Sequence, residues 1–313
     1  MFNYYALLIK KVERYDAIMK LGLSVFSAAL LASSLYAVTP GGVQKKFIAL
    51  NFDTMFNAPS NVFAHAEALN AVQWLDGIAV SLRDVPVKTL DGRTETSEST
   101  RLMHLNHVWS YENVKDQLPY LSGLVKYPRL KESFLLTWIT PAGKENRIGW
   151  TDDAAWARFG ENLAVLARLA KKAGLKGLML DPEEYSCALQ YIYTEAEKDI
   201  SFEECTRLAR KRGREVFSRV FKEFPDGVYF FLWTIEHHVR TFTGRAETNP
   251  KGISDDMGEL LTYFYNGMFD VMPPTVRFVD GAEHYSLTST KDMYWKGALN
   301  QLVGARAFVA PEN

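Results

Sequence analysis

Short apolar runs alternate along this chain with longer segments of helical periodicity, and this alternation limits the fold more than any other feature. In segments such as 61–75, apolar residues recur at three- and four-residue spacing, which predicts helices. The runs with the length and composition of strands are 47–53, 76–82, 133–143, 177–183, 228–236 and 275–285. Strands that alternate with helices are typical of a parallel sheet covered by helices. The sequence therefore predicts an α/β fold.

Two of the predicted helices carry clear boundary signals. Thr151 is suited to cap a helix that continues to Gly174. Ser201 and Glu204 have the spacing of a capping box at the start of the next helix, which runs to residue 224. Further helices are expected over 61–75, 110–128, 259–272 and 289–309, and a loop is expected over 84–100.

Two architectures place parallel strands beneath helices: an eight-stranded βα barrel and an open doubly wound sheet. The chain has no Gly-rich strand-to-helix turn of the dinucleotide-binding type, and polar residues follow the carboxyl ends of many of its strands. Both features favour the barrel. The predicted fold class is thus a (β/α)8 TIM-type barrel, and because about six βα units are visible, we expect it to be incomplete at the C-terminus.

The N-terminus predicts export. An apolar stretch of the length of a signal-peptide core follows Met19 and Lys20 and ends in small residues. We expect residues 1–37 to be an N-terminal extension and signal peptide, and residues 38–313 to form a single barrel domain. The protein would then be secreted or periplasmic, without a stable membrane span after cleavage. An uncleaved anchor is the alternative.

The composition argues against several partners. The 313 residues carry a formal net charge of −1, which gives no electrostatic footprint for nucleic acid. Aromatic residues make up 13% of the chain, which suits stacking on sugar rings, although large cores use aromatic residues too. We predict no cofactor and no zinc site, because no Cys/His spacing resembles one. Cys187 and Cys205 flank a loop that could bring them together. The sequence leaves two alternatives for this pair, a disulfide or two free thiols. The oligomeric state stays open as well.

The strand at 177–183 ends in acidic residues, which makes it the main candidate for chemistry. Side chains alternate along a strand, so Asp181 and Glu183 would share one face and leave Leu178 and Leu180 facing the helices. In a barrel this places both carboxyl groups at the catalytic rim. A neighbouring carboxylate is one way to raise the pKa of a general acid. The pair is therefore suited to protonate a glycosidic oxygen.

Other strand ends supply partners for this pair. Glu283 is the best second carboxylate, as nucleophile or electrostatic stabiliser. A retaining glycosidase separates its carboxyl groups by about 5–5.5 Å and an inverting one by about 6.5–9.5 Å, and both outcomes are open. The candidate substrate-binding residues are Asn51, Asp53, Trp138, Trp233, Glu236 and Tyr285.

The stretch "GLMLDPE" resembles the fourth-strand signature of chitinase-like glycoside hydrolases, a Gly and apolar residues followed by Asp-x-Glu. This resemblance implies that Glu183 is the general acid and that Asp181 orients the acetamido group of the substrate. Lys176 and Met179 occupy two positions that are acidic in that signature, and Pro182 replaces its usual aromatic residue. The wider resemblance is to glycoside-hydrolase-like barrels, with a carbohydrate as substrate.

Two other functions compete with a glycosidase. The first is a non-catalytic protein that binds carbohydrate through aromatic strand ends, in which Trp138 and Trp233 could stack on sugar as readily as fill a core. The second is a metal-dependent hydrolase that uses Asp53, Asp181 and histidines. Against the second, His237 and His238 are adjacent on a strand and point to opposite faces, and His104 and His107 have no nearby carboxylate in the sequence. We therefore predict no metal ligand.

Overall fold

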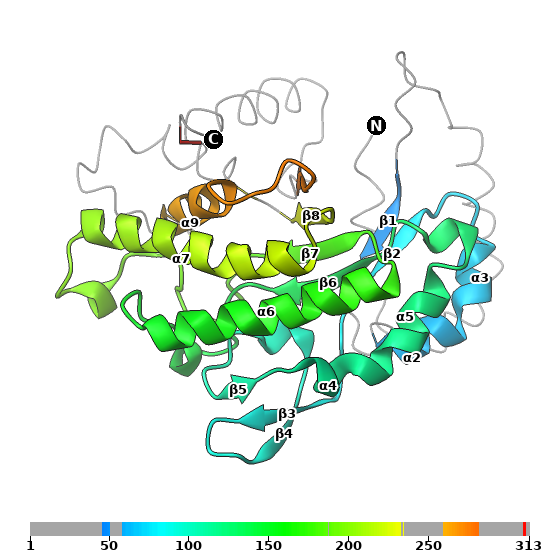
Figure 1. Cartoon of the computed structure of the whole chain (residues 1–313), viewed down its shortest axis with the longest axis horizontal. Helices are drawn as coiled ribbons and strands as arrows, with labels where there is room; N and C mark the ends of the chain where they lie inside the picture. The colour runs from blue at the N-terminus through cyan, green and yellow to red at the C-terminus, as the bar shows by residue number, and fades with distance from the viewer. Residues whose placement is uncertain are drawn as a thin grey trace.

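A computed structural model of the chain describes residues 46–50, 58–186, 188–232, 234, 259–281 and 309–310. Its centre is a six-stranded sheet in which every neighbouring pair is parallel. Figure 1 shows this sheet behind a layer of helices. The strands follow one another in chain order: β1 (Ile48–Leu50), β2 (Gly77–Val80), β6 (Phe134–Trp138), β7 (Gly177–Asp181), β8 (Val228–Phe231) and β9 (Arg277–Asp280).

The predicted eight-stranded barrel is wrong. A barrel closes only when its last strand pairs with its first. Within the described residues, β1 pairs with β2 alone and β9 with β8 alone, so the sheet curls into a half-barrel with two open edges. The sequence predicted correctly that the strands are parallel and apolar. Neither property determines whether the sheet closes into a barrel. Closure depends on strand number and stagger, which the pattern of each single strand does not contain.

A second, antiparallel sheet breaks the alternation of strands and helices. The chain between β2 and β6 forms β3 (Val85–Thr89), β4 (Thr94–Ser97) and β5 (His107–Val108), in the order β4-β3-β5. This corrects the loop predicted over 84–100. Buried and exposed residues alternate along β3, as in a strand with one solvated face. In Figure 1 the small sheet lies below the helix layer.

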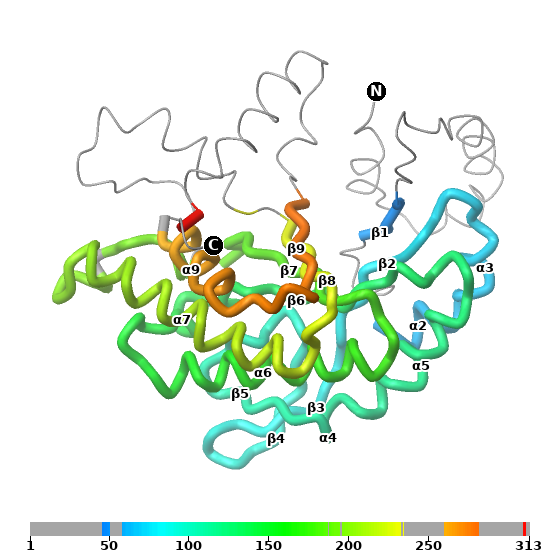
Figure 2. The backbone as a smooth tube through the Cα atoms, turned by 45° about the horizontal axis from the view of Figure 1, so that its top comes forward, coloured from blue at the N-terminus to red at the C-terminus, as the bar shows by residue number. Residues whose placement is uncertain are grey.

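The helices pack along one face of the large sheet. Neighbouring helices in this layer contact one another in the order α2, α5, α6, α7 and α9, which Figure 2 shows from a second side. The helices are α2 (Pro59–Ala64), α3 (Ala66–Asn70), α4 (Tyr111–Val114), α5 (Leu118–Leu124), α6 (Asp153–Ala173), α7 (Phe202–Glu223) and α9 (Glu259–Phe269). Short 3-10 turns are η2 (Ser99–Arg101), η3 (Lys115–Gln117), η4 (Pro128–Leu130), η5 (Lys144–Asn146) and η6 (Glu195–Glu197). The single helix predicted over 61–75 is split at His65, whose ψ of 10° is not helical.

Local capping chemistry fixes the two longest helices. Asp152, one residue later than predicted, caps α6 by accepting a hydrogen bond from the N–H of Ala155 at 2.9 Å. Gly174 ends α6 with a φ of 75°, the left-handed conformation that glycine adopts without strain. Ser201 caps α7 by accepting a hydrogen bond from the N–H of Glu204, as predicted.

Contacts in the core between the sheet and the helices show on which face of the sheet each strand residue lies. The ring of Phe231 on β8 packs on Phe217 of α7 and Tyr265 of α9. Leu180 of β7 is the register partner of Phe231, so it faces the helices too. Met179 and Asp181 therefore lie on the opposite face, and the predicted division of this strand into two faces is confirmed up to Asp181.

A buried arginine joins α7 to the segment that leads into α6. Arg212 is 1% exposed, and its Nε and Nη2 atoms donate hydrogen bonds to the carbonyl of Trp150 at 3.0 and 2.8 Å. Its Nη1 atom pairs with Asp153 at 2.6 Å and with Glu215 at 2.7 Å. All three nitrogens of the guanidinium thus have partners, as a buried cation requires.

Some predictions fall on residues that the structure does not describe. They include the signal peptide within 1–37 and almost all of the helix expected over 289–309. Within the described ranges, no helix combines the length and the apolar character needed to cross a membrane.

Candidate functional site

The carboxyl ends of β6 and β7 bring an aromatic and an acidic side chain together. Trp138, the last residue of β6, is the register partner of Asp181, the last residue of β7. Register partners on adjacent parallel strands point to the same face. Both residues therefore lie on the face of the sheet opposite the helices, at the edge where the strands end.

Asp181 is fully buried, and hydrogen bonds hold both of its carboxylate oxygens. Oδ1 accepts the backbone N–H of Glu183 at 2.9 Å, and Oδ2 accepts the hydroxyl of Tyr185 at 2.9 Å. The first contact is an Asx turn, in which a carboxylate satisfies the backbone two residues ahead. It ends the strand at Asp181. The prediction that Glu183 continues the strand is therefore wrong, and Glu183 reaches the site from a turn.

Tyr185 spans the boundary between the buried carboxylate and solvent. The residue is 50% exposed, yet its hydroxyl points inward to Asp181. Burial of the hydroxyl raises the pKa of Tyr185 well above its ordinary value, and the negative charges of Asp181 and Glu183 raise it further. The phenol is thus a hydrogen-bond donor, not an acid, at any physiological pH.

The rings of Trp138 and Tyr185 form an aromatic corner beside these carboxylates. Their centroids lie 4.8 Å apart at an interplanar angle of 36°. The Nε1 atom of Trp138 is buried and has no hydrogen-bond partner among the residues that the structure describes. An unpaired buried donor is uncommon in proteins.

The loops after β6 and β7 are joined by side-chain hydrogen bonds to backbone carbonyls. Thr140 donates to the carbonyl of Glu183 at 2.7 Å. Ser186 donates to the carbonyl of Pro141 at 2.6 Å, and the fully buried Tyr191 donates to that of Ile139 at 2.7 Å. The first of these bonds anchors the backbone of the partly buried Glu183, and the other two hold neighbouring parts of the two loops together.

Glu184, next in sequence, has a different role. Its carboxylate accepts hydrogen bonds from the backbone N–H groups of Leu189 at 3.2 Å and Gln190 at 2.8 Å. Burial raises the pKa of Glu184, and the backbone hydrogen bonds oppose that rise. The two adjacent glutamates therefore make different contacts: the Glu184 carboxylate holds the backbone of the loop, and the backbone N–H of Glu183 holds Asp181.

The loop that follows is tied to the segment before α6. Gln190 donates to the carbonyl of Ile148 at 2.9 Å and accepts the N–H of the same residue at 2.7 Å. Arg147 pairs with the buried Glu197 at 2.5 Å. The site is thus built on two well-anchored loops.

Several predicted site residues lie outside the described residues. They are Asn51, Asp53, Trp233, Glu236, Glu283 and Tyr285. Cys187 also lies outside them, while Cys205 is buried. Of the predicted set, the structure therefore brings together Asp181, Glu183 and Trp138.

The histidines form a structural contact in the small sheet. His104 and His107 stack with ring centroids 4.0 Å apart. His107 lies within 3.0 Å of the Ser97 hydroxyl and 3.3 Å of the Glu95 carboxylate, a carboxylate that the sequence spacing did not reveal. No group of three His, Cys, Asp or Glu side chains in the described ranges is placed to hold a metal ion.

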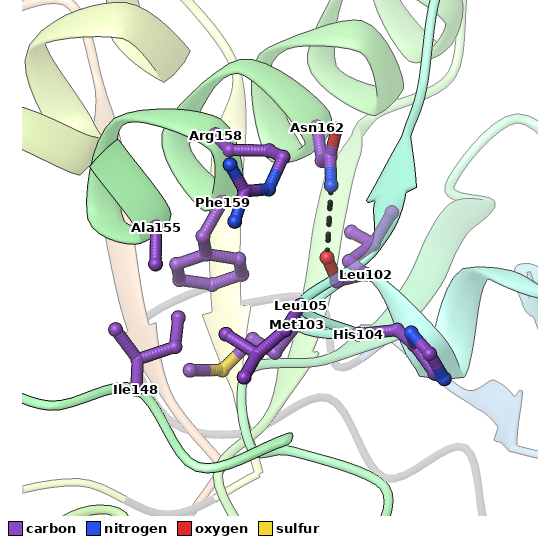
Figure 3. A pocket seen from close by; sticks show the side chains of 9 residues that line it. All are labelled: Leu102, Met103, His104, Leu105, Ile148, Ala155, Arg158, Phe159 and Asn162. Atoms are coloured by element: carbon purple, nitrogen blue, oxygen red, sulfur yellow. Dashed lines mark hydrogen bonds between the residues drawn. The ribbon is translucent and has the colours of Figure 1, made fainter. Parts of the chain in front are cut away.

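A small hollow lies elsewhere, between α6 and the segment after η2. Figure 3 shows Arg158, Phe159 and His104 among the residues that line it. Its empty space of about 140 Å³ includes open solvent, and its walls are too close together to admit a water molecule. Sites for small molecules are several times larger. The hollow shares no residue with the cluster around Asp181, and it is a packing gap.

Sequence reasoning missed Tyr185, although a signal for it was present. Tyr185 lies four residues after Asp181, within the same acidic stretch. Once Asp181 closes an Asx turn, the chain reverses and brings Tyr185 back over the carboxylate. Comparison of the chain with protein-family models and with curated proteins finds no match.

Proposed function

We propose that the chain is a glycoside hydrolase whose site lies at the carboxyl edge of β6 and β7. One observation carries this proposal: the buried Asp181 carboxylate accepts hydrogen bonds from the Tyr185 hydroxyl and from the backbone N–H of Glu183, beside the aromatic corner of Trp138 and Tyr185. Aromatic faces bind the apolar faces of sugar rings, and carboxyl groups supply the proton that glycosidic cleavage needs. The export predicted from residues 19–37 suits an enzyme that acts on external polysaccharides.

In this proposal Glu183 is the general acid. Its carboxyl proton passes to the glycosidic oxygen while the bond from that oxygen to the anomeric carbon breaks, and the bonding electron pair stays on the oxygen. The leaving sugar departs as an alcohol. Water adds to the anomeric carbon and loses its proton to a base, so that hydrolysis is complete. A second carboxylate for this step, for which Glu283 is our candidate, belongs to the residues outside the described ranges.

Asp181 supports the reaction without donating a proton. Its two oxygens are already engaged by Glu183 N–H and the Tyr185 hydroxyl. A buried carboxylate held in this way is a fixed negative charge, and it favours the positive charge that develops on the sugar ring in the transition state.

The test is hydrolysis of a panel of aryl glycosides by the purified chain and by Glu183→Gln. We expect the variant to lose about 100-fold or more in kcat on substrates with poor leaving groups, because the proton donor is gone. Glu112→Gln is the matched control: it makes the same change at an exposed helical position. Equal activity of the wild type and Glu183→Gln would show that Glu183 is not the acid.

A second candidate is a carbohydrate-binding protein without catalysis. The half-exposed Tyr185 ring against Trp138 favours it, because this surface could bind sugar with no chemistry at all. Titration with oligosaccharides, followed by tryptophan fluorescence, separates the two functions. Binding without hydrolysis, unchanged in Glu183→Gln, would support the binding protein and reject the enzyme.

A further inference from the structure

We propose that the carboxyl ends of β2 and β6 form a subsite in which Ser81, Arg83 and Trp138 donate hydrogen bonds to the oxygen atoms of a neutral sugar unit. This inference rests on the proposed function and adds a substrate class to it. It starts from three buried atoms, Ser81 Oγ, Arg83 Nε and Trp138 Nε1, none of which has a hydrogen-bond partner within the described residues.

The register of the large sheet places Ser81 and Trp138 on one face. Ala79 of β2 is the register partner of Phe134 of β6, and side chains alternate along each strand. Ser81 comes two residues after Ala79, and Trp138 comes four residues after Phe134. Both therefore lie on the face that also carries Asp181 of the next strand, β7. Figure 1 shows these three strands side by side.

The chain beyond β2 stays attached to β6, so the alternation extends to Ser81. The hydroxyl of Ser99 accepts the N–H of Leu82 at 2.9 Å and donates to the carbonyl of Leu136 at 2.9 Å. The hydroxyl of Thr137 on β6 donates to the carbonyl of Ser99. Ser99 thus bridges the two strand ends. Ser81 directly precedes this bridge and is fully buried, so its unpaired hydroxyl belongs to a fixed part of the fold.

Arg83 belongs to the same junction. Its Nη1 atom pairs with Glu98, the residue before Ser99, and the two side chains are only 18% and 20% exposed. The pair neutralises the charge of the guanidinium and leaves its Nε–H without a partner in the described part of the chain. Arg83 is therefore anchored at the strand ends with one donor to spare.

The three groups determine the kind of ligand. The indole and guanidinium N–H groups only donate, and a serine hydroxyl can donate as well, so the ligand must offer oxygen acceptors. Glu98 balances the charge of Arg83, and the buried Asp181 adds a negative charge, so an anionic ligand is disfavoured. A neutral sugar unit offers hydroxyl and ring oxygens. Its apolar face suits the half-exposed ring of Tyr185 beside Trp138.

The other buried side-chain atoms without a partner in the described ranges lie around α6. They belong to His104, Trp109 and Trp150. The backbone N–H of Trp109 donates to Asn162 of α6, and the ring of Trp150 stacks on Trp156 of the same helix. Trp109 is therefore a control for Trp138, because it carries the same unpaired indole N–H next to α6.

The first test uses the ligand-free protein and does not depend on activity. Ser81→Ala removes a buried hydroxyl but no hydrogen bond, so we expect the urea midpoint to stay unchanged or to rise. Ser133→Ala is the matched control. Ser133 is equally buried, but its hydroxyl donates to the carbonyl of Leu130 at 2.8 Å and accepts the N–H of Ile78 at 3.1 Å. We expect its midpoint to fall. An equal fall in Ser81→Ala would show that this hydroxyl already has a partner, a bound water included, and would overturn the inference.

The second test measures sugar binding by isothermal titration calorimetry. The probes are neutral hexasaccharides of glucose, xylose and mannose, with hexagalacturonate as the acidic counterpart. All proteins in this test also carry Glu183→Gln, so that bound sugar is not consumed. We expect a neutral hexasaccharide to bind, and Ser81→Ala to weaken it about 3- to 10-fold, the equivalent of one hydrogen bond. Arg83→Lys, which keeps a cation for Glu98 and removes Nε–H, should have a similar effect.

The third comparison isolates the indole N–H. Trp138→Phe and Trp109→Phe each keep an aromatic ring and remove one unpaired N–H group. We expect the affinity for the neutral hexasaccharide to fall in Trp138→Phe and to stay unchanged in Trp109→Phe and in Ser133→Ala. Failure of every neutral probe to bind, binding of hexagalacturonate alone, or affinities that Ser81→Ala and Trp138→Phe leave unchanged would each reject the subsite.

The outcomes separate the two proposals. If a neutral hexasaccharide binds through these residues but wild type hydrolyses no glycoside, the proposed enzyme fails and the subsite stands. If wild type hydrolyses glycosides with a KM that Ser81→Ala, Arg83→Lys and Trp138→Phe leave unchanged, the function stands and the subsite is rejected.

Discussion

The carboxylate of Glu184 accepts the backbone N–H of Gln190 at 2.8 Å, and this bond closes the loop that carries Tyr185. The neighbouring N–H of Leu189, a residue with the rare positive φ of 56°, donates to the same carboxylate. A non-glycine residue holds such a conformation only where its surroundings compensate for the strain. Glu184 supplies that compensation.

The first prediction concerns the charge of Glu184. Because burial raises its pKa in the folded state above the ordinary 4.5, the folded protein binds this proton more tightly than the unfolded chain does. Stability from this group is therefore lost as pH rises from about 4.5 through the folded pKa. Glu184→Gln has no such group to titrate. We therefore expect its free energy of unfolding minus that of wild type to increase as pH rises through this window. Urea denaturation at several pH values measures it, with Glu112→Gln as control, and a difference that is constant with pH would contradict it.

The second prediction concerns the histidine stack. Burial lowers the pKa of His104 and the adjacent His107 lowers it further, while Glu95 and Glu145 raise it and Arg101 lowers it. A lowered pKa means that the unfolded chain binds more protons, so stability is present above the ordinary value of about 6.5 and is lost as pH falls. When pH falls from about 7.5 to about 5, we expect the free energy of unfolding to decrease less in His104→Gln than in wild type. Urea denaturation at several pH values measures this difference, and equal losses in the two proteins would contradict the prediction.

The third prediction compares two neighbouring cations. Arg212 and Lys211 both pair with Asp153, but the Arg212 side chain is 1% exposed and that of Lys211 is 43% exposed. Arg212→Ala removes two hydrogen bonds from the Trp150 carbonyl in the core, and we expect a loss of about 1–3 kcal/mol. Lys211→Ala should cost less than about 1 kcal/mol. Equal losses in chemical denaturation would show that burial does not set the strength of this contact.

The fourth prediction concerns the start of β7. A Cβ atom added to Gly177 would lie 1.7 Å from the carbonyl oxygen of Val228 on β8, closer than any real contact. Gly177→Ala must therefore push β7 and β8 apart, and we expect at least the loss of about 1–3 kcal/mol that is typical of overpacking. Gly149→Ala is the control, since its Cβ would meet nothing within 4 Å. Thermal unfolding of the two variants measures the difference.

Parts of the fold were predictable because their causes are local. The cap of α7 at Ser201 needs only residues within one turn, and it was predicted correctly. The faces of β7 follow from alternation along five residues, which holds from Gly177 to Asp181. The chemical character of the site was predictable for the same reason, since Asp181 and Trp138 follow apolar runs that become neighbouring strands.

The sequence by itself thus determined the strands of the large sheet, the two longest helices and the acidic end of β7, because these follow from periodicity, propensity and capping over a few residues. Only the tertiary structure decided that the sheet stays open, that Glu95 meets His107, and that Tyr185 rather than solvent faces Asp181. Each of these depends on where segments distant in the chain, or a turn of specific geometry, come to lie in space. The physical reason is that side-chain patterns record burial against some partner, but they do not record which partner it is.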